Sequence, residues 1–354
     1  MDKSIAVGIL GTGGMAAAHV EMYRKIAGVE IATCFDISPA RSKAFADKHD
    51  IAHVAADIGD VLSRVDAISI VTPDRFHAAL TLQALAAGKH VLCEKPLTLT
   101  LAEATDVAAA ACAASERGII HMVNFSYRSS AAFQEAIRVA GSGALGEIRH
   151  VHSSYLQSWL NFNIDSATAT DAGLWRLSTA LGSQGVLGDL GCHLLDLTTA
   201  CSDDLSAVRC ELRTFPKRVD GIPSPSVNGR ELDANDTAII EFELAGGGIG
   251  VCHTTRWATG NGNHIRFEVN GTEGALRFDL EEDPNVLHVW TGDAKGARHW
   301  EAKTLEKTPS NWERFIRSIR TGVQDQPDIL RGARVQAYLD ACERSAASKQ
   351  WEQV

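Results

Sequence analysis

The sequence predicts an α/β protein of two domains: an N-terminal domain on a parallel sheet, and a C-terminal α+β domain with an open, largely antiparallel sheet. Apolar strands alternate with helical segments as far as residue 125, which is typical of parallel sheets with right-handed crossovers. Short β-rich runs then follow one another with few helices between them, which is typical of antiparallel sheets. A length of 354 residues suits about two domains. We therefore expect domains at 1–125 and 126–354, with the C-terminal helix able to pack back on the first.

The first strand of the N-terminal domain, residues 5–10, runs into a glycine-rich turn that opens a helix at Ala16. The turn fits the dinucleotide pattern G-x-G-x-x-G/A. Gly11 permits the tight turn, and Gly13 lets backbone N–H groups approach a pyrophosphate. The helix N-terminus adds oriented donors and partial positive charge. We therefore expect a Rossmann domain whose cofactor-binding loop comprises Gly11, Thr12, Gly13, Gly14 and Met15.

A second strand, residues 29–35, ends in Asp36, which lies 20 positions after Ala16. The pattern calls for a carboxylate at this place to bind the adenosine ribose hydroxyls. Asp36 would repel a 2′-phosphate, so the sequence favours NAD over NADP, although Arg41 on the following helix softens that preference. The alternative is an ordinary βαβ unit in which Asp36 is a surface residue.

The remaining elements follow from apolar periodicity and from Gly and Pro signals. In the N-terminal domain, Ser38 is the expected N-cap of the helix that contains Arg41, and Gly88 closes a later helix. The expected helices are 40–49, 57–62, 75–87 and 98–115, and the expected strands are 67–71, 90–93 and 119–123. In the C-terminal domain we expect helices at 133–140, 186–200, 312–321 and 329–348, strands at 148–156, 207–214, 237–244, 249–257, 264–270 and 275–279, and a loop at 215–235.

Composition excludes several classes of protein. A net charge of −10 without a cluster of Lys and Arg argues against a nucleic-acid partner. The eight cysteines show no C-x-x-C pair and no zinc-ribbon spacing, so we expect a reduced, cytoplasmic protein without a metal site. No apolar segment is long enough to span a membrane. The first apolar run carries the glycine turn and is therefore a strand rather than a signal peptide.

Cys93-Glu94-Lys95-Pro96 lies at the carboxyl end of an expected parallel strand, the edge where ligands bind in open α/β sheets. Lys95 could touch a reacting oxygen there, and Glu94 could reach a ribose or hold the lysine. The alternative is a solvated turn.

The segment Gly188–Asp196 carries a second constellation. In a helix, Asp189 and His193 lie four residues apart on one face, with Asp196 three beyond the histidine. An acid and an imidazole on one face form a plausible proton-transfer pair. The alternatives are an amphipathic helix whose polar residues cap local backbone, and a metal pair, for which two ligands are too few.

Taken together, these segments resemble the glucose–fructose oxidoreductase, inositol dehydrogenase and rhizopine-catabolism (Gfo/Idh/MocA) family over nearly the whole chain. The residues that carry the resemblance are the glycine turn, Thr72-Pro73-Asp74-Arg75-Phe76-His77, Ala87–Pro96 with its Glu-Lys-Pro, and the Gly-Asp-x-Gly-x-His-x-x-Asp of residues 188–196. Asn124, Tyr127 and Arg128 also match the segment that usually follows the sixth strand.

The resemblance implies NAD(P)-dependent oxidation of a secondary alcohol on a sugar or cyclitol, or the reverse. By this analogy Lys95 binds the reacting hydroxyl, His193 takes its proton, and Asp189 orients the substrate or the histidine. The cofactor would be bordered by Thr72, Pro73, His77, Glu94 and Lys95. The resemblance also implies a homodimer or homotetramer formed through the C-terminal sheet.

Substrate contacts are expected from the loop before the Gly-Asp motif and from Tyr127. Trp159, Asn161 and Asn163 are candidates, but we favour Trp175 and Arg176, because indole faces pack on sugar C–H groups and Arg binds hydroxyls or carboxylates. Arg256 and Trp257, at a strand end, could do the same. Each of these is as easily structural, since buried Trp is common in cores and Arg176 could pair with an acid.

Two other functions are compatible with the same residues. One is redox-assisted cleavage of a glycosidic bond with NAD recycled in the site, which gives no net NADH. The other is a non-catalytic dinucleotide-binding sensor, which we rank last because Lys95, Asp189 and His193 are all present.

Overall fold

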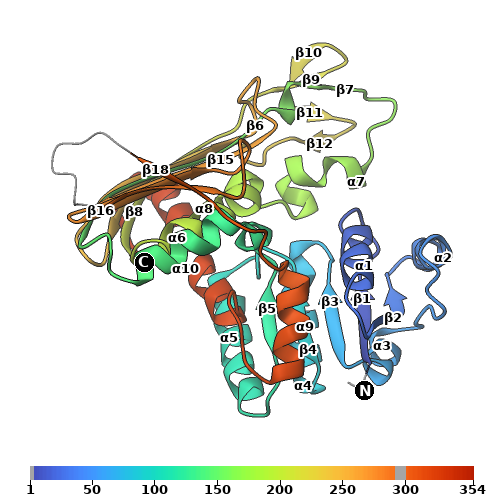
Figure 1. Cartoon of the computed structure of the whole chain (residues 1–354). Coiled ribbons are helices and arrows are strands. Elements are labelled where there is room, and N and C mark those ends of the chain that lie inside the picture. The colour runs from blue at the N-terminus through green and yellow to red at the C-terminus, as the bar shows by residue number, and fades with distance from the viewer. Residues whose placement is uncertain (1–3, 292–299) are drawn as a thin grey trace. The chain divides into compact units, whose positions relative to one another are not determined.

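The computed structural model describes residues 4–291 and 300–354, and its contacts divide the chain into two compact units (Figure 1). Unit 1 comprises Met1–Ser126 and Pro309–Gln336, and unit 2 comprises Tyr127–Thr308 and Ala337–Val354. The long helix α10 (Ile329–Ser348) contributes its first turns to unit 1 and its remainder to unit 2.

Unit 1 is built on a parallel sheet in the order β2-β1-β3-β4-β5, which confirms the predicted Rossmann architecture. The strands are β1 (Ile5–Leu10), β2 (Val29–Phe35), β3 (Ala67–Ile70), β4 (His90–Cys93) and β5 (His121–Val123). The helices are α1 (Ala16–Arg24), α2 (Pro39–Lys48), α3 (Ile58–Arg64), α4 (His77–Ala86), α5 (Leu101–Ser115) and α9 (Asn311–Thr321), with the 3₁₀ turn η1 (Asp74–Phe76) before α4. The strand order reverses at β1, and ligands bind at such switch points in doubly wound sheets.

Helix starts in unit 1 follow the capping residues of the sequence. The Ser38 side chain accepts a hydrogen bond from the Arg41 N–H at the start of α2, as expected. Thr100 and Glu103 form a reciprocal capping box at the start of α5. These caps satisfy backbone donors that a helix otherwise leaves without an intrahelical partner, and they therefore fix where each helix begins.

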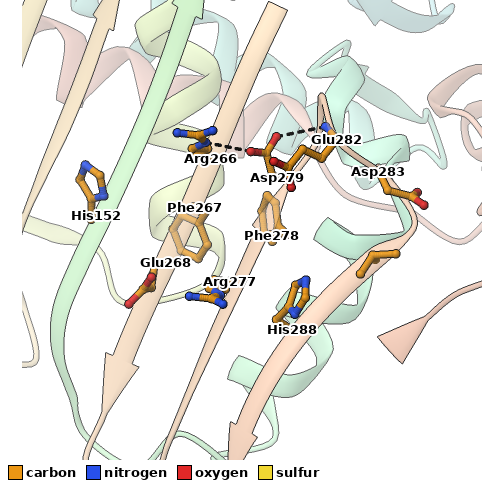
Figure 2. Close-up of a pocket in the computed structure, with 11 residues that line it drawn as sticks. His152, Arg266, Phe267, Glu268, Arg277, Phe278, Asp279, Glu282, Asp283 and His288 are labelled. Carbon is orange, nitrogen blue, oxygen red and sulfur yellow. Dashed lines mark hydrogen bonds and ion pairs between the residues drawn. The ribbon is translucent and has the colours of Figure 1, made fainter. Parts of the chain in front are cut away.

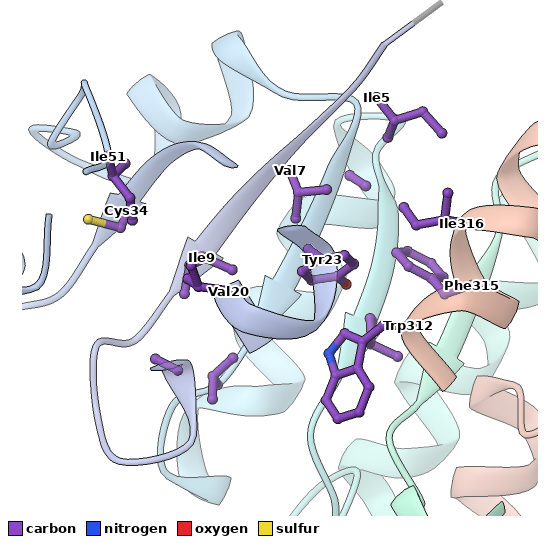
Figure 3. Packing of buried hydrophobic residues seen from close by; sticks show 14 of the residues in the cluster. Ile5, Val7, Ile9, Val20, Tyr23, Cys34, Ile51, Trp312, Phe315 and Ile316 are labelled. Atoms are coloured by element: carbon purple, nitrogen blue, oxygen red, sulfur yellow. The ribbon is translucent and has the colours of Figure 1, made fainter. Parts of the chain in front are cut away.

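The core of unit 1 joins segments from the two ends of the chain. Helix α9 presents Trp312, Phe315 and Ile316 to apolar residues of β1 and α1, where the Tyr23 ring is fully buried (Figure 3). Helix α9 begins with a capping box between Ser310 and Glu313. Residues far apart in the sequence therefore stabilise the sheet that carries the glycine turn.

Unit 2 contains a nine-stranded sheet in the order β18-β17-β16-β15-β6-β14-β13-β8-β19. Only the β6–β14 pair is parallel among its described strands, which confirms an open, largely antiparallel sheet. In β13, Ile240 and Phe242 are buried, whereas Glu241 and Glu243 are exposed, the alternation expected of a sheet with one face packed on a core. The strands are β6 (Ile148–Gln157), β8 (Leu205–Arg213), β13 (Thr237–Leu244), β14 (Ile249–Thr255), β15 (Asn263–Gly271), β16 (Gly274–Asp279), β17 (Val286–Thr291), β18 (Glu301–Thr304) and β19 (Glu352–Gln353).

The helices of unit 2 are α6 (Ala131–Gly141), α7 (Asp171–Leu174) and α8 (Cys192–Ala200), and unit 2 also holds most of α10. The helix expected at 186–200 is not uniform, because a π-helical turn, η6 (Leu187–Gly191), precedes α8. Short 3₁₀ turns lie at η2 (Ser126–Ser129), η3 (Trp159–Asn161), η4 (Trp175–Leu177) and η5 (Thr179–Leu181).

The prediction of a loop at 215–235 was wrong in part, because this segment forms short strands. They are β9 (Lys217–Val219), β10 (Ile222–Ser224), β11 (Ser226–Val227) and β12 (Arg230–Glu231), and β9 also pairs with β7 (Asn163–Ile164). Pro223 is tolerated because β10 is an edge strand of its sheet, where a missing N–H interrupts no ladder. Strands β17, β18 and β19 were not predicted either.

The described part of the chain has no helix with both the length and the apolar character needed to cross a bilayer. Its His, Cys, Asp and Glu side chains form no group of three or more that could hold a metal ion. The eight cysteines, all within the described ranges, form no disulfide.

Candidate active site

The glycine turn between β1 and α1 has the form that a pyrophosphate needs. Gly11 has φ of +90°, and a Cβ at this position would lie 2.6 Å from the Val71 carbonyl oxygen, so only glycine fits. A Cβ added to Gly13 or Gly14 would meet no protein atom within 4 Å. These two glycines therefore border open space at the N-terminus of α1, where backbone donors and the helix dipole favour phosphate.

Asp36, at the end of β2, holds the glycine turn through its carboxylate. One oxygen accepts hydrogen bonds from the Thr12 N–H (3.1 Å) and Oγ1 (3.0 Å), and the other accepts from Ser38 N–H (2.9 Å) and Arg41 Nη2 (2.7 Å). Partial burial acts to raise the pKa of Asp36, but the hydrogen bonds from Ser38, Arg41 and Thr12 outweigh it and lower that pKa. The carboxylate is therefore ionised and lies beside an exposed guanidinium.

We expect the Asp36→Ser variant to shift cofactor preference toward NADP. The substitution removes the charge that repels a 2′-phosphate and leaves Arg41 available to bind it. The ratio of the Kd for NADPH to the Kd for NADH, from fluorescence titration, should fall by about 10- to 100-fold. Asp47→Ser is the matched control. It also removes a carboxylate, but Asp47 pairs with Lys43 on the exposed face of α2, the helix that carries Arg41. An unchanged ratio in Asp36→Ser would show that Asp36 does not face the adenosine ribose.

Glu94 anchors a buried polar network across the carboxyl ends of β3, β4 and β5. Its Oε1 contacts His19 Nε2 at 2.9 Å and accepts a hydrogen bond from Asn124 Nδ2 at 2.6 Å, while His19 Nδ1 contacts Ser69 Oγ at 2.7 Å. Burial acts to raise the pKa of Glu94, but the contacts with His19 and Asn124 hold it at about 2. An ionised carboxylate thus lies next to Lys95, which is half-buried.

Thr72, Pro73 and His77 lie together after β3. The His77 ring contacts the Thr72 carbonyl oxygen through Nε2 (2.9 Å) and the Pro96 carbonyl oxygen through Nδ1 (2.8 Å), so one side chain ties two turns together. The Thr72 hydroxyl is buried and has no hydrogen-bond partner within the described ranges. This orphaned hydroxyl and the open glycine turn both fit a dinucleotide bound along the carboxyl edge of the sheet.

The Asp189–His193 pair lies across the π-helical turn rather than within a regular α-helix. Asp189 belongs to η6, and His193 is the second residue of α8. A Cβ on Gly188 would lie 2.3 Å from the Gln184 Cβ, so the close packing of this turn depends on glycine. Single π-turns occur frequently at functional sites.

His193 is buried against two tyrosines. The Tyr127 and Tyr155 rings meet its imidazole edge-on, with centroid distances of 4.9 and 6.2 Å. The two tyrosine hydroxyls lie 2.6 Å apart, and the Asn263 amide bonds to both of them. Burial raises the pKa of Tyr155 far above its ordinary value, so its hydroxyl stays protonated.

Asp189 is held by a buried arginine that the sequence did not link to it. Arg256 is fully buried and donates from Nη2 to Asp189 Oδ2 at 2.8 Å, while its Nη1 donates to the Arg176 carbonyl oxygen at 3.0 Å. The Arg176 side chain also faces Asp189, at 3.6 Å from Nε to Oδ2. The sequence offered Arg256 as a possible substrate contact, but this side chain is an ion-pair partner of Asp189.

The favoured substrate contacts, Trp175 and Arg176, lie against each other. The Arg176 guanidinium lies 4.3 Å from the centroid of the Trp175 ring, a cation–π geometry, and its side chain is 42% exposed. Trp159 contacts Arg256 in the same way, at 5.1 Å, and lines a cavity of about 250 Å³ together with Leu160.

Asp196 has a different environment from Asp189 and His193. Its carboxylate accepts two hydrogen bonds from Arg128, at 2.8 Å from Nε and 2.7 Å from Nη2, and both side chains are buried. This bidentate pair connects η2 to α8 within unit 2. Both residues belong to segments singled out in the sequence, but their pairing was not predicted, because nothing in the local pattern links positions 68 residues apart.

A further cavity of about 540 Å³ lies over β15, β16 and β17 and contains none of the predicted site residues. Arg266, Glu268 and Arg277 line it, and Arg266 pairs with Asp279 (Figure 2). It is therefore a feature of the sheet and not of the candidate site.

The structure thus gathers the predicted residues into two groups, one in each unit. Unit 1 contains the glycine turn, Asp36, Arg41, Thr72, Pro73, His77, Glu94 and Lys95, whereas unit 2 contains Tyr127, Trp175, Arg176, Asp189 and His193. The first group has the features of a dinucleotide site. The second presents an imidazole, a carboxylate and two tyrosine hydroxyls.

Two family models match the chain. The model of an oxidoreductase family with an NAD-binding Rossmann fold, GFO_IDH_MocA, matches residues 5–125, and the GFO/IDH/MocA C-terminal domain matches residues 133–277. Levoglucosan dehydrogenase from Pseudarthrobacter phenanthrenivorans is 27% identical over 99% of this chain and 98% of its own length. Inositol 2-dehydrogenase from Rhizobium meliloti is 25% identical over 98% of both chains.

Solved structures are also similar to this chain over nearly its whole length. The crystal structure of an oxidoreductase domain protein from Kribbella flavida has a TM-score of 0.87 and 31% identity over 99% of both chains. A levoglucosan dehydrogenase in complex with NADH has a TM-score of 0.85 and 26% identity, again over 99% of both chains.

Proposed function

Because the chain belongs to the Gfo/Idh/MocA family of oxidoreductases with an NAD-binding Rossmann domain, we propose that it oxidises a secondary hydroxyl of a sugar, sugar derivative or cyclitol, or reduces the corresponding ketone. The observation that carries the proposal is the presence of both groups of residues: a dinucleotide turn with Glu94 and Lys95, and His193 one turn after Asp189 along η6 and α8. The NAD nicotinamide, when bound, supplies the hydride acceptor or donor.

The residues of this chain would move and stabilise the proton. Removal of a proton and a hydride from one carbon requires a base at the hydroxyl and a cation for the developing alkoxide. We assign the base to His193, because imidazole exchanges protons near neutral pH, and the cation to Lys95. The Tyr127 and Tyr155 rings pack edge-on against His193 and restrict the plane of its ring.

Asp189 acts in this proposal as a fixed hydrogen-bond acceptor. Its contacts with Arg256 and Arg176 stabilise the ionised carboxylate and fix its direction. An acceptor of this kind can orient a substrate hydroxyl or a catalytic cation, but it is poorly suited to take a proton itself. Trp175, Arg176 and Tyr127 are proposed to contact the substrate, because indole, guanidinium and phenol groups suit C–H faces and hydroxyls of sugars.

The proposal is tested by nicotinamide absorbance with purified protein, NAD or NADP, and a panel of anhydrosugars, inositols, aldoses, sugar acids and glycosides. Net NADH from at least one member of the panel is the expected result. Cleavage of a glycoside without net NADH would favour redox-assisted elimination. Tight NAD binding without any turnover would favour a sensor.

We also propose that a second copy of this chain covers the open face of the nine-stranded sheet. This face carries charges of both signs, including Arg277 and Glu268, together with exposed Ile239 and Ile249. Mixed charges can pair across a two-fold axis, and exposed isoleucines favour burial. Sedimentation velocity of the full chain should give a dimer or tetramer, and a monomer at all concentrations would refute the proposal.

A further inference from the structure

The His77 ring is fully buried, and each of its two nitrogens lies within hydrogen-bond distance of a carbonyl oxygen, a group that only accepts hydrogen bonds. Its Nδ1 lies 2.8 Å from the Pro96 carbonyl oxygen, and its Nε2 lies 2.9 Å from the Thr72 carbonyl oxygen. A neutral imidazole has one N–H donor and one acceptor nitrogen, so it can satisfy only one of these two carbonyls. Both contacts are hydrogen bonds only when both ring nitrogens carry a proton.

The surroundings of the ring also favour the charged form. Burial acts to lower the pKa of His77, but the charge interaction and hydrogen bond with the Cys93 side chain on β4, followed by Asp74 in η1 and the Pro96 carbonyl, raise it to about 10. His90, on the same strand as Cys93, has the opposite arrangement: its Nδ1 accepts a hydrogen bond from the Ile120 N–H, and burial lowers its pKa. The surroundings of the two histidines therefore shift their pKa values in opposite directions.

The strand order indicates which part of a dinucleotide His77 faces. The adenosine side is marked by Asp36 at the end of β2, and the pyrophosphate turn follows β1. A dinucleotide held in this direction would have its nicotinamide half on the other side of β1, where residues after β3 and β4 would border it. Thr72 and Pro96, the two residues that hold His77, follow these two strands.

We propose that His77 is an imidazolium at neutral pH beside the nicotinamide half of the site and that its charge favours NADH over NAD⁺. The nicotinamide ring is cationic in NAD⁺ and neutral in NADH, so a fixed positive charge destabilises only the oxidised form. The inference rests on the proposed function and adds the favoured direction of hydride transfer: the bound cofactor is biased toward accepting hydride from the substrate.

The first test measures affinity rather than turnover. The ratio of the Kd for NAD⁺ to the Kd for NADH should fall about fourfold in His77→Gln, as Coulomb's law gives for unit charges roughly 10 Å apart at an effective dielectric constant of roughly 40. His90→Gln is the matched control, since it removes a neutral histidine from the same sheet, and its ratio should equal that of the wild type. An unchanged ratio in His77→Gln, or a chain that binds neither form, overturns the proposed bias.

The second test addresses the proton itself and needs neither substrate nor cofactor. In ¹⁵N-histidine-labelled protein at pH 8, both ring nitrogens of His77, identified by their loss in His77→Gln or His77→Asn, should be protonated. The melting temperature of the wild type should exceed that of His77→Gln most below pH 6.5. The difference should shrink as the pH rises toward 10, because the stability that a raised pKa contributes is complete below the ordinary pKa of histidine and is lost as the pH rises to the raised value. One unprotonated nitrogen at pH 8, or a difference independent of pH, would overturn the imidazolium while leaving the dehydrogenase proposal intact.

Discussion

The His193→Asn variant is expected to lower kcat by about 10²- to 10⁴-fold while the Kd for NADH changes less than about twofold. Asparagine keeps a polar side chain against Tyr127 but cannot take a proton from a hydroxyl. Lys95→Met should lower kcat by about 10²- to 10³-fold, because it removes the cation that stabilises developing alkoxide. Stopped-flow measurement of NADH formation separates this step from product release.

The matched control is His90→Asn, which replaces a half-buried histidine at the amino end of β4, away from the carboxyl edge of the sheet. Its kcat should equal that of the wild type. Turnover that survives both His193→Asn and Lys95→Met would mean that the chemistry has been assigned to the wrong residues. A loss of NADH binding in His193→Asn would indicate instead that the variant has disturbed the fold.

The largest effect on stability is expected from Arg128→Leu. It leaves the Asp196 carboxylate buried without the guanidinium that now donates two hydrogen bonds to it. Removal of one partner of a buried ion pair costs about 3 to 5 kcal/mol of unfolding free energy. Urea denaturation of the full chain measures this loss as a fall in the transition midpoint.

A double variant separates the two causes of that loss. Arg128→Leu/Asp196→Leu removes both charges, so it should recover much of the stability lost in Arg128→Leu alone. Arg138→Leu serves as the control, because Arg138 pairs with Glu135 on an exposed helix face, and its midpoint should hardly change. If the single and double variants are equally destabilised, the loss arises from packing and not from an uncompensated charge.

The sequence was sufficient for the Rossmann domain because its signals are local. The turn from β1 to α1 needs glycine at Gly11, because the residue there has a positive φ and no room for a Cβ. Asp36 follows at the spacing that one βαβ unit imposes. The long strands of the nine-stranded sheet were predictable because buried and exposed residues alternate along them, as Ile240 and Glu241 do in β13.

Other features depend on contacts that local patterns do not encode. Arg256 meets Asp189 only after β14 and η6 have packed together, and residues so far apart in sequence carry no shared signature. The hydrogen bonds of a π-helical turn span five residues instead of the four of an α-helix, a difference that the apolar spacing of 186–200 does not reveal. The strands at 217–231 are two or three residues long, too short for an alternating pattern to appear.

The two hydrogen bonds proposed for the His77 ring also depend on contacts that a local sequence pattern does not encode. The family resemblance predicts that His77 borders the cofactor, but its protonation depends on two carbonyls, one of them 19 residues away. Charge state is a property of the folded surroundings, whereas the sequence supplies only the titratable group.

The central claim is that hydride passes between a sugar carbon and NAD with His193 and Lys95 acting on the hydroxyl of that carbon. The most direct measurement is the deuterium content of NADH, by mass spectrometry, after incubation of NAD with carbon-deuterated members of the substrate panel. We predict NADH carrying one deuterium with the wild type, and almost none formed by His193→Asn or Lys95→Met. NADH without deuterium, or no NADH from any member of the panel, would contradict the account.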